Sequence, residues 1–194
     1  ILKWASVAIS IPIIIGTKKA LDDFMEFQQE IINVRAVTGA TASEMQRLTD
    51  NAIGMSTELK FTAKEIASAY LELGQAGYDA NEILEATSQV MVLAAAGMQD
   101  ISFTSELVVT TLKAFNLEAS EASRIADVFA ASNAKSVSSL DKISASLKYT
   151  AGLWASQGWE VENLVGVLGV LYDTGVRGEK AGRMLASAIR SLIK

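Results

Sequence analysis

The 194-residue sequence contains no cysteine and no histidine. Without cysteine, the chain has neither a disulfide framework nor a thiol nucleophile. Without histidine, it lacks the commonest general base and the commonest ligand of zinc and other transition metals. The most frequent kinds of hydrolytic, redox and metal-dependent sites are therefore excluded.

Proline and clustered basic residues are also scarce. Proline occurs once, at Pro12, and the only adjacent basic pair is Lys18–Lys19. The formal net charge is −5, from 17 basic and 22 acidic residues. Such a charge pattern gives no electrostatic footprint for nucleic acid, so we expect no sequence-specific nucleic-acid binding.

What the sequence does contain is apolar residues at helical spacing. Hydrophobic residues make up 50% of the chain and charged residues 20%, enough to bury a sizeable core. The periodicity predicts an all-α fold, a Gly-cornered bundle of about eight or nine short helices. The helices are expected at 18–37, 41–58, 62–74, 79–97, 100–116, 120–133, 140–156, 161–174 and 181–193.

Capping boxes mark three of the predicted helix starts, at Thr41, Thr62 and Asp79, each with glutamate three residues later. Their spacing is irregular, which argues against a repeat solenoid. The β-branched run 108–111 could form a strand, but the apolar residues around it recur at helical spacing, which favours a helix.

Glycines are expected at the corners between helices, because glycine adopts positive φ without a Cβ penalty. Gly77 is predicted to adopt such a φ. Gly182 is predicted to allow a close approach of the 164–171 helix, so that the last two helices form an antiparallel hairpin whose core face is Leu185, Ile189 and Leu192. Gly54 is predicted to mark another close contact. The predicted structural corners are Gly74, Gly77, Gly158, Gly175, Gly178 and Gly182.

Residues 1–17 form an apolar N-terminal segment of what we interpret as a fragment of a longer chain, and 18–194 form a helical core domain. The uninterrupted run 4–15 is too short to span a bilayer, its flanks do not fit a signal peptide, and Pro12 is expected to interrupt a helix there. Two interpretations remain: a core or interface segment of a larger assembly, or the end of a membrane-active segment.

No residue pattern in the sequence predicts a catalytic, cofactor-binding or metal-binding site. Phosphate-binding and dinucleotide-binding glycine motifs are absent, and the acidic pairs 22–23 and 160–162 are typical of solvated surfaces. We therefore expect no catalytic, cofactor-binding or metal-binding residues, and no enzyme. The one candidate functional group is a basic patch at the last corner, formed by Arg177, Lys180 and Arg183.

Five stretches in order resemble the core domain of phage tail tape measure proteins of the TP901 type. The similarity runs from about Ala20 to Leu192 and departs from the family pattern at Arg183 and at Leu185–Ala186. The stretches are Phe24-Met25-Glu26, LELGQAGYDANEIL at 71–84, VMVLAAAG at 90–97, AFNLEASEASRIADVFAAS at 114–132 and LKYTAGLWASQGWEVENLVGVLGVLYDTGVRGEKAGRML at 147–185.

The resemblance implies a structural virion protein that sets phage tail length inside the tail tube and is released at infection, during DNA ejection. It implies a place in the tail lumen, or in the host cytoplasm during assembly. Implied partners are the tail tube protein, tail tip or baseplate proteins, tail assembly chaperones, further copies of the chain and the host membrane. The alternative is a membrane-active helical module that forms a channel for DNA passage through the host envelope. A cell-wall hydrolase is a third hypothesis, which the missing histidines oppose.

Overall fold

The computed structural model describes residues 3–193, with side chains from residue 19 onward. Over this range the chain forms nine α-helices and one short 3-10 helix, which confirms the all-α prediction. The elements are α1 (Lys3–Thr38), α2 (Ala42–Glu58), α3 (Ala63–Gln75), α4 (Ala80–Gly97), α5 (Ile101–Ala114), η1 (Ala119–Glu121), α6 (Ala122–Lys135), α7 (Leu140–Ala155), α8 (Val161–Asp173) and α9 (Gly178–Leu192).

The three predicted capping boxes are present at the starts of α2, α3 and α4. In each, the cap side chain accepts a hydrogen bond from the backbone of the third helical residue, whose carboxylate accepts one in return. The returning bond measures 2.8 Å at Thr41 and 2.7 Å at Thr62 and Asp79. Backbone donors that an isolated helix start leaves unpaired are satisfied locally in this way.

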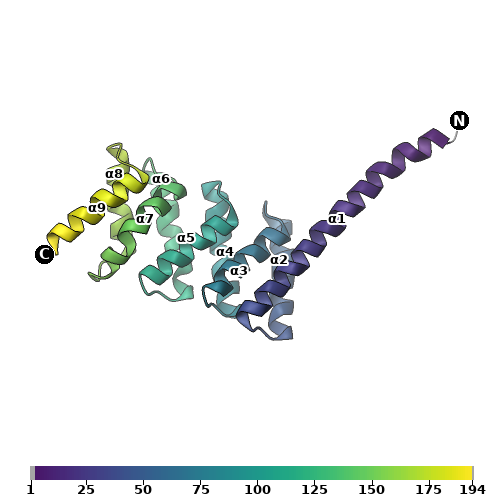
Figure 1. Cartoon of the computed structure of the whole chain (residues 1–194), viewed down its shortest axis with the longest axis horizontal. Helices are drawn as coiled ribbons and strands as arrows, with labels where there is room; N and C mark the ends of the chain where they lie inside the picture. Colours follow the sequence, from purple (N-terminus) through teal and green to yellow (C-terminus); the bar gives the residue numbers. More distant parts are fainter. Residues whose placement is uncertain (1–2, 194) are drawn as a thin grey trace.

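The helices stack in two layers, as Figure 1 shows. In one layer α1 packs on α3, α3 on α5, α5 on α7 and α7 on α9; in the other, α2 packs on α4, α4 on α6 and α6 on α8. This is the arrangement of helices in α-solenoids. The irregular spacing of the capping boxes therefore wrongly argued against solenoid-like stacking of the helices. Stacking of helical hairpins requires only short connections and apolar faces, and it does not require that the sequence itself repeats.

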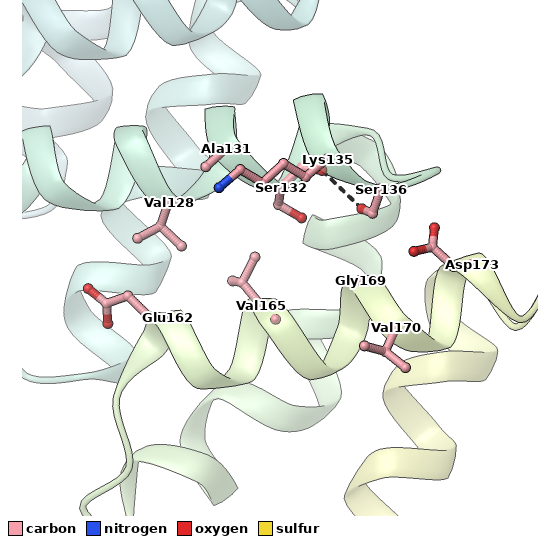
Figure 2. Close-up of a pocket in the computed structure, with 11 residues that line it drawn as sticks. Val128, Ala131, Ser132, Lys135, Ser136, Glu162, Val165, Gly169, Val170 and Asp173 are labelled. Carbon is pink, nitrogen blue, oxygen red and sulfur yellow. Dashed lines mark hydrogen bonds between the residues drawn. The ribbon is translucent and has the colours of Figure 1, made fainter.

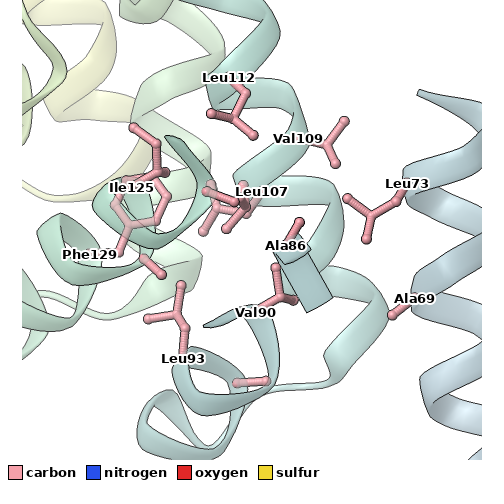
Figure 3. Close-up of a cluster of buried hydrophobic side chains, with 14 of the residues drawn as sticks. Ala69, Leu73, Ala86, Val90, Leu93, Leu107, Val109, Leu112, Ile125 and Phe129 are labelled. Carbon is pink, nitrogen blue, oxygen red and sulfur yellow. The ribbon is translucent and has the colours of Figure 1, made fainter. Parts of the chain in front are cut away.

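A continuous apolar core runs between the two layers (Figure 3). Figure 3 shows Leu73 of α3, Val90 of α4, Leu112 of α5 and Phe129 of α6 converging on it. Buried threonines do not interrupt this core. Thr87 and Thr111, for example, donate their hydroxyls to backbone carbonyls of Ile83 and Leu107 in the same helix, at 2.6 and 2.7 Å.

The first helix is longer than expected. α1 spans 36 residues and crosses both Pro12 and the proposed division between 17 and 18. The interruption predicted at Pro12 was therefore wrong for the backbone. Proline removes one helical hydrogen bond and bends a helix, but the remaining bonds hold the helix on either side. Residues 1, 2 and 194 lie outside the described residues.

Four of the predicted corner glycines adopt positive φ: Gly77 (+96°), Gly158 (+72°), Gly175 (+90°) and Gly178 (+57°). Gly74 is different, because it lies inside α3 and is buried. A Cβ there would lie 2.8 Å from Val37 Cγ2, so this glycine lets α1 approach α3. The close contact predicted at Gly54 was wrong, since a Cβ there would meet no atom within 4 Å.

The partner of the last helix also differs from the prediction. α9 packs mainly along α7 and only slightly along α8, so the close approach at Gly182 is to Ser146 of α7. A Cβ at Gly182 would lie 2.6 Å from the Ser146 carbonyl oxygen. Ile189 is buried and Leu185 is half-buried, but Leu192 is 78% exposed and does not complete the core.

A hydroxyl pair joins the three C-terminal helices. The Tyr172 hydroxyl of α8 lies 2.8 Å from Ser146 Oγ of α7, and Ser146 Oγ donates to the carbonyl of Gly178, the first residue of α9. Burial raises the pKa of Tyr172 to about 12. The corner between α8 and α9 is thus fixed from inside the array.

Replacing Gly77 by valine is expected to destabilise the chain by at least about 1–2 kcal/mol, because a β-branched residue is strained at positive φ. Thermal or denaturant unfolding followed by circular dichroism measures this loss. Gly54→Val is the matched control: Gly54 lies in α2 with open space around it. Equal unfolding midpoints for the two variants would contradict the strain argument.

Candidate partner-binding surfaces

The first candidate surface is a groove of about 410 Å³ between α6 and α8, shown in Figure 2. Val128, Val165 and Val170 form apolar parts of its wall, and Gly166 and Gly169 leave α8 without side chains where the groove is open. Polar groups border it as well. Asp173 accepts a hydrogen bond from the backbone N–H of Val137, at 2.9 Å.

This groove was not predicted from the sequence. Gly166 and Gly169 lie on the 164–171 helix that was predicted to approach Gly182. A Cβ at Gly166 would meet no atom within 4 Å, however, and one at Gly169 would make ordinary contact with Ser136. The sequence feature that could have indicated the groove is a pair of glycines one turn apart on α8, beside Val165 and Val170. Glycine spacing alone does not distinguish a packed surface from an open one.

An ion cluster centred on Arg124 borders the groove at Glu162. Arg124 binds both carboxylate oxygens of Glu162, with Nε–Oε1 at 2.6 Å and Nη2–Oε2 at 2.8 Å, and Glu121 with Nη1–Oε2 at 3.0 Å. Such a bidentate pair fixes α8 against α6 with defined geometry. Hydrogen bonds from Arg124 hold the pKa of Glu162 below its usual value of 4.5.

Acid is expected to weaken the contribution of Glu162. Because its pKa is lower in the folded state, the stabilisation is fully present above the unfolded-state value and is lost as the pH falls through the folded-state pKa. The denaturant concentration at the unfolding midpoint should therefore be higher for wild type than for Glu162→Gln at pH 7. The difference between the two midpoints should shrink at pH 3. The effect should be small because the side chain is 38% exposed. Glu85→Gln on α4 is the control, and a difference that grows in acid would contradict the assignment.

The predicted basic patch lies at the corner that begins α9. Arg183 stacks over the Tyr149 ring, with Cζ 4.9 Å from the centroid, and donates to Glu179 at 3.0 Å. Arg177 donates to the Tyr172 carbonyl oxygen at 3.4 Å. Two of the three basic side chains thus contact their own chain, and Lys180 is exposed beside them.

A third surface is apolar and lies at the N-terminal end of the array. A groove of about 370 Å³ runs between α1 and α2, and we call it the α1–α2 groove. Several large apolar side chains on these two helices are exposed to solvent. The groove is lined by Phe24, Phe27, Gln28, Ile31, Ile32, Thr49 and Ile53.

The described part of the chain contains no single-helix membrane span and no acidic metal cluster. No single helix there has the length and apolarity needed to cross a bilayer. Taken together, α4 and α5 have sufficient length and apolar composition, but the pair is bent by 119° at its junction. Both helices contribute many buried residues to the core. Among residues 3–193 no group of three or more acidic side chains could hold a metal ion.

These features define a helical array with open grooves and a basic corner on its surface. Residues 49–194 match the family of phage-related minor tail proteins, and the chain belongs to this family. It is therefore a structural component of a phage tail, as the sequence resemblance implied. Membership of this family gives no support to the membrane-channel alternative.

Two curated relatives are similar to the chain. The tape measure protein of Pneumococcus phage Dp-1 is 33% identical over 192 residues, which cover 99% of this chain and 17% of that protein. The probable tape measure protein of Escherichia phage P2 is 26% identical over 159 residues, which cover 81% of this chain and 20% of that protein. The chain thus spans one fifth or less of the length of these relatives. No solved structure matches it significantly.

Proposed function

We propose that the chain is a helical module of a tape measure protein, which sets tail length inside the tail tube and leaves it at infection. The observation that carries this proposal is the match of 99% of the chain to a protein named as a tape measure protein. The module would act in the tail lumen, after assembly in the host cytoplasm, without catalysis or cofactor. Its partners would be the tail tube protein, tail tip or baseplate proteins, assembly chaperones and other copies of itself.

Duplication of residues 18–194 within the full-length protein tests this role. Roughly 180 added residues would lengthen the tail by about 270 Å if they extend as continuous helix at about 1.5 Å per residue. They would add far less if the two-layer array stays folded inside the tube. Electron microscopy of the virions measures the change. Tails of unchanged length would contradict a contribution of this module to the ruler.

We propose further that Arg177, Lys180 and Arg183 contact another tail protein. Their position at one corner of the array supports this, although Arg183 is already paired with Glu179. Reversal of all three charges to glutamate should leave the helical spectrum intact and abolish tail assembly. Reversal at three other exposed basic positions, Arg47, Lys60 and Lys113, is the matched control. Equal tail yields from both triple variants would contradict the patch.

A further inference from the structure

Two helical stripes line the groove between α6 and α8. On α6 the lining residues follow the i, i+3, i+4, i+7 pattern of one helix face from Val128 to Lys135, and on α8 they follow the same pattern from Glu162 to Asp173 (Figure 2). The lining side chains between the charged ones are small or apolar. Two such rows side by side accept the side chains of a third helix between them.

The glycine at position 166 is not required by the fold of the module. Gly166 is exposed on α8, and a Cβ there would meet no atom within 4 Å. Its φ is not among the positive values found at the corner glycines. Glycine is less favourable than alanine inside a helix, so α8 carries an unfavourable residue that no contact of the described side chains explains. The bare backbone lets another chain approach α8 closely at this point.

Charge along the groove follows the order acidic, basic, acidic. Asp173 lies at the end of α8, and Glu162 and Glu160 lie at its start, about 20 Å away along the helix axis. Lys135 is exposed on α6, and Figure 2 shows its nitrogen pointing back along that helix toward Ala131, between the two acidic ends. A helix with a basic residue near each end and an acidic residue near its middle is complementary to this order.

The groove continues at its Glu162 end into an aromatic pocket of about 200 Å³, which we call the Trp159 pocket. Trp159 is 37% exposed there. Arg124, which lines the pocket, is held by Glu162 at 2.6 Å and by Glu121 at 3.0 Å, whereas the Glu160 side chain is 69% exposed and lies 3.5 Å from it. A cation from a partner can therefore pair with Glu160 and stack on the Trp159 ring.

We propose that this groove binds an amphipathic α-helix of another protein, with an apolar face, a basic residue near each end and an acidic residue between them. The apolar face packs on Val165 and Val170 and approaches the backbone at Gly166. The acidic residue pairs with Lys135, one basic end enters the Trp159 pocket, and the other pairs with Asp173. The site goes beyond the proposed function and does not depend on a role in setting tail length.

Isothermal titration calorimetry of the 194-residue chain with a synthetic helix tests the site. The probe is a peptide of about 15 residues, long enough to span the groove, with leucines on one face, a lysine near each end and a glutamate in the middle. Wild type should bind it, and Gly166→Leu should weaken binding at least roughly 10-fold, because the new side chain fills the groove. The same variant should not lower the unfolding midpoint, since the position is open and leucine favours helix. Gly54→Leu is the control, because Gly54 is equally open but lies on α2.

A charge-reversed peptide, in which both lysines are glutamate and the glutamate is lysine, tests the chemistry that is recognised. It should bind at least roughly 10-fold more weakly at low salt. Glu160→Gln should reduce the difference between the two peptides, whereas Glu85→Gln on α4 should not. Absence of binding to wild type, equal affinities of the two peptides, or equal binding by Gly166→Leu would overturn the proposal. So would a wild-type dimer that Gly166→Leu converts to monomer in sedimentation, because a second copy would then fill the groove.

Discussion

Phe129→Ala is expected to lower the free energy of unfolding by about 3–5 kcal/mol. Phe129 is fully buried in the apolar core between the two layers (Figure 3). Truncation removes its apolar surface from the core and leaves a cavity that the surrounding helices can only partly fill. Equilibrium unfolding in urea, followed by circular dichroism, measures the loss.

Val170→Ala is the control for this experiment, since Val170 is 65% exposed on α8. Its effect on stability should stay within about 0.5 kcal/mol. If both variants unfold at the same urea concentration, the placement of Phe129 in the common core is wrong. A change confined to the slope of the transition would instead indicate that the array unfolds in parts.

Gly182→Ala is expected to destabilise the chain by about 1–3 kcal/mol, and Gly182→Leu by more. A single Cβ at this position would lie 2.6 Å from the carbonyl oxygen and 2.8 Å from the Cα of Ser146. These are backbone atoms, so no side-chain rotation relieves the overlap, and α9 must move away from α7. The Ser146 hydroxyl would then lose its bond to the Gly178 carbonyl oxygen.

Gly166→Ala is expected to have the opposite effect on stability. Gly166 lies within α8, and a Cβ there would meet no atom within 4 Å. Alanine should therefore stabilise the helix by about 1 kcal/mol through its higher helix propensity. Thermal unfolding of both variants under the same conditions compares the two positions. Similar shifts at Gly182 and Gly166 would contradict the close packing of α7 on α9.

Sequence patterns predicted those features that depend on neighbouring residues. The caps at Thr41, Thr62 and Asp79 were predicted because the hydroxyl or carboxylate and its glutamate lie within one turn of helix. Gly182 was recognised as a close contact for a similar reason, since glycine is unfavourable in a helix unless packing requires it. Such signals are contained in a few consecutive residues.

Features that depend on distant residues were predicted less well. The partner of Gly182 is Ser146 of α7 and not the adjacent α8, because stacking in two layers brings every second helix together. The groove between α6 and α8 was missed for the same reason, as Gly166 carries no mark of being open. Helical periodicity identifies the buried face of each helix but not the helix that covers it.

The two-layer stacking has a mechanical consequence. In the described part of the chain, no helix packs extensively on one more than two places along the sequence. A pulling force applied at one end therefore has to break only the contacts of the terminal hairpin, after which the next becomes terminal. The helical hairpins can therefore unfold one after another while the chain is pulled through an opening too narrow for the folded array, and they can refold in the reverse order.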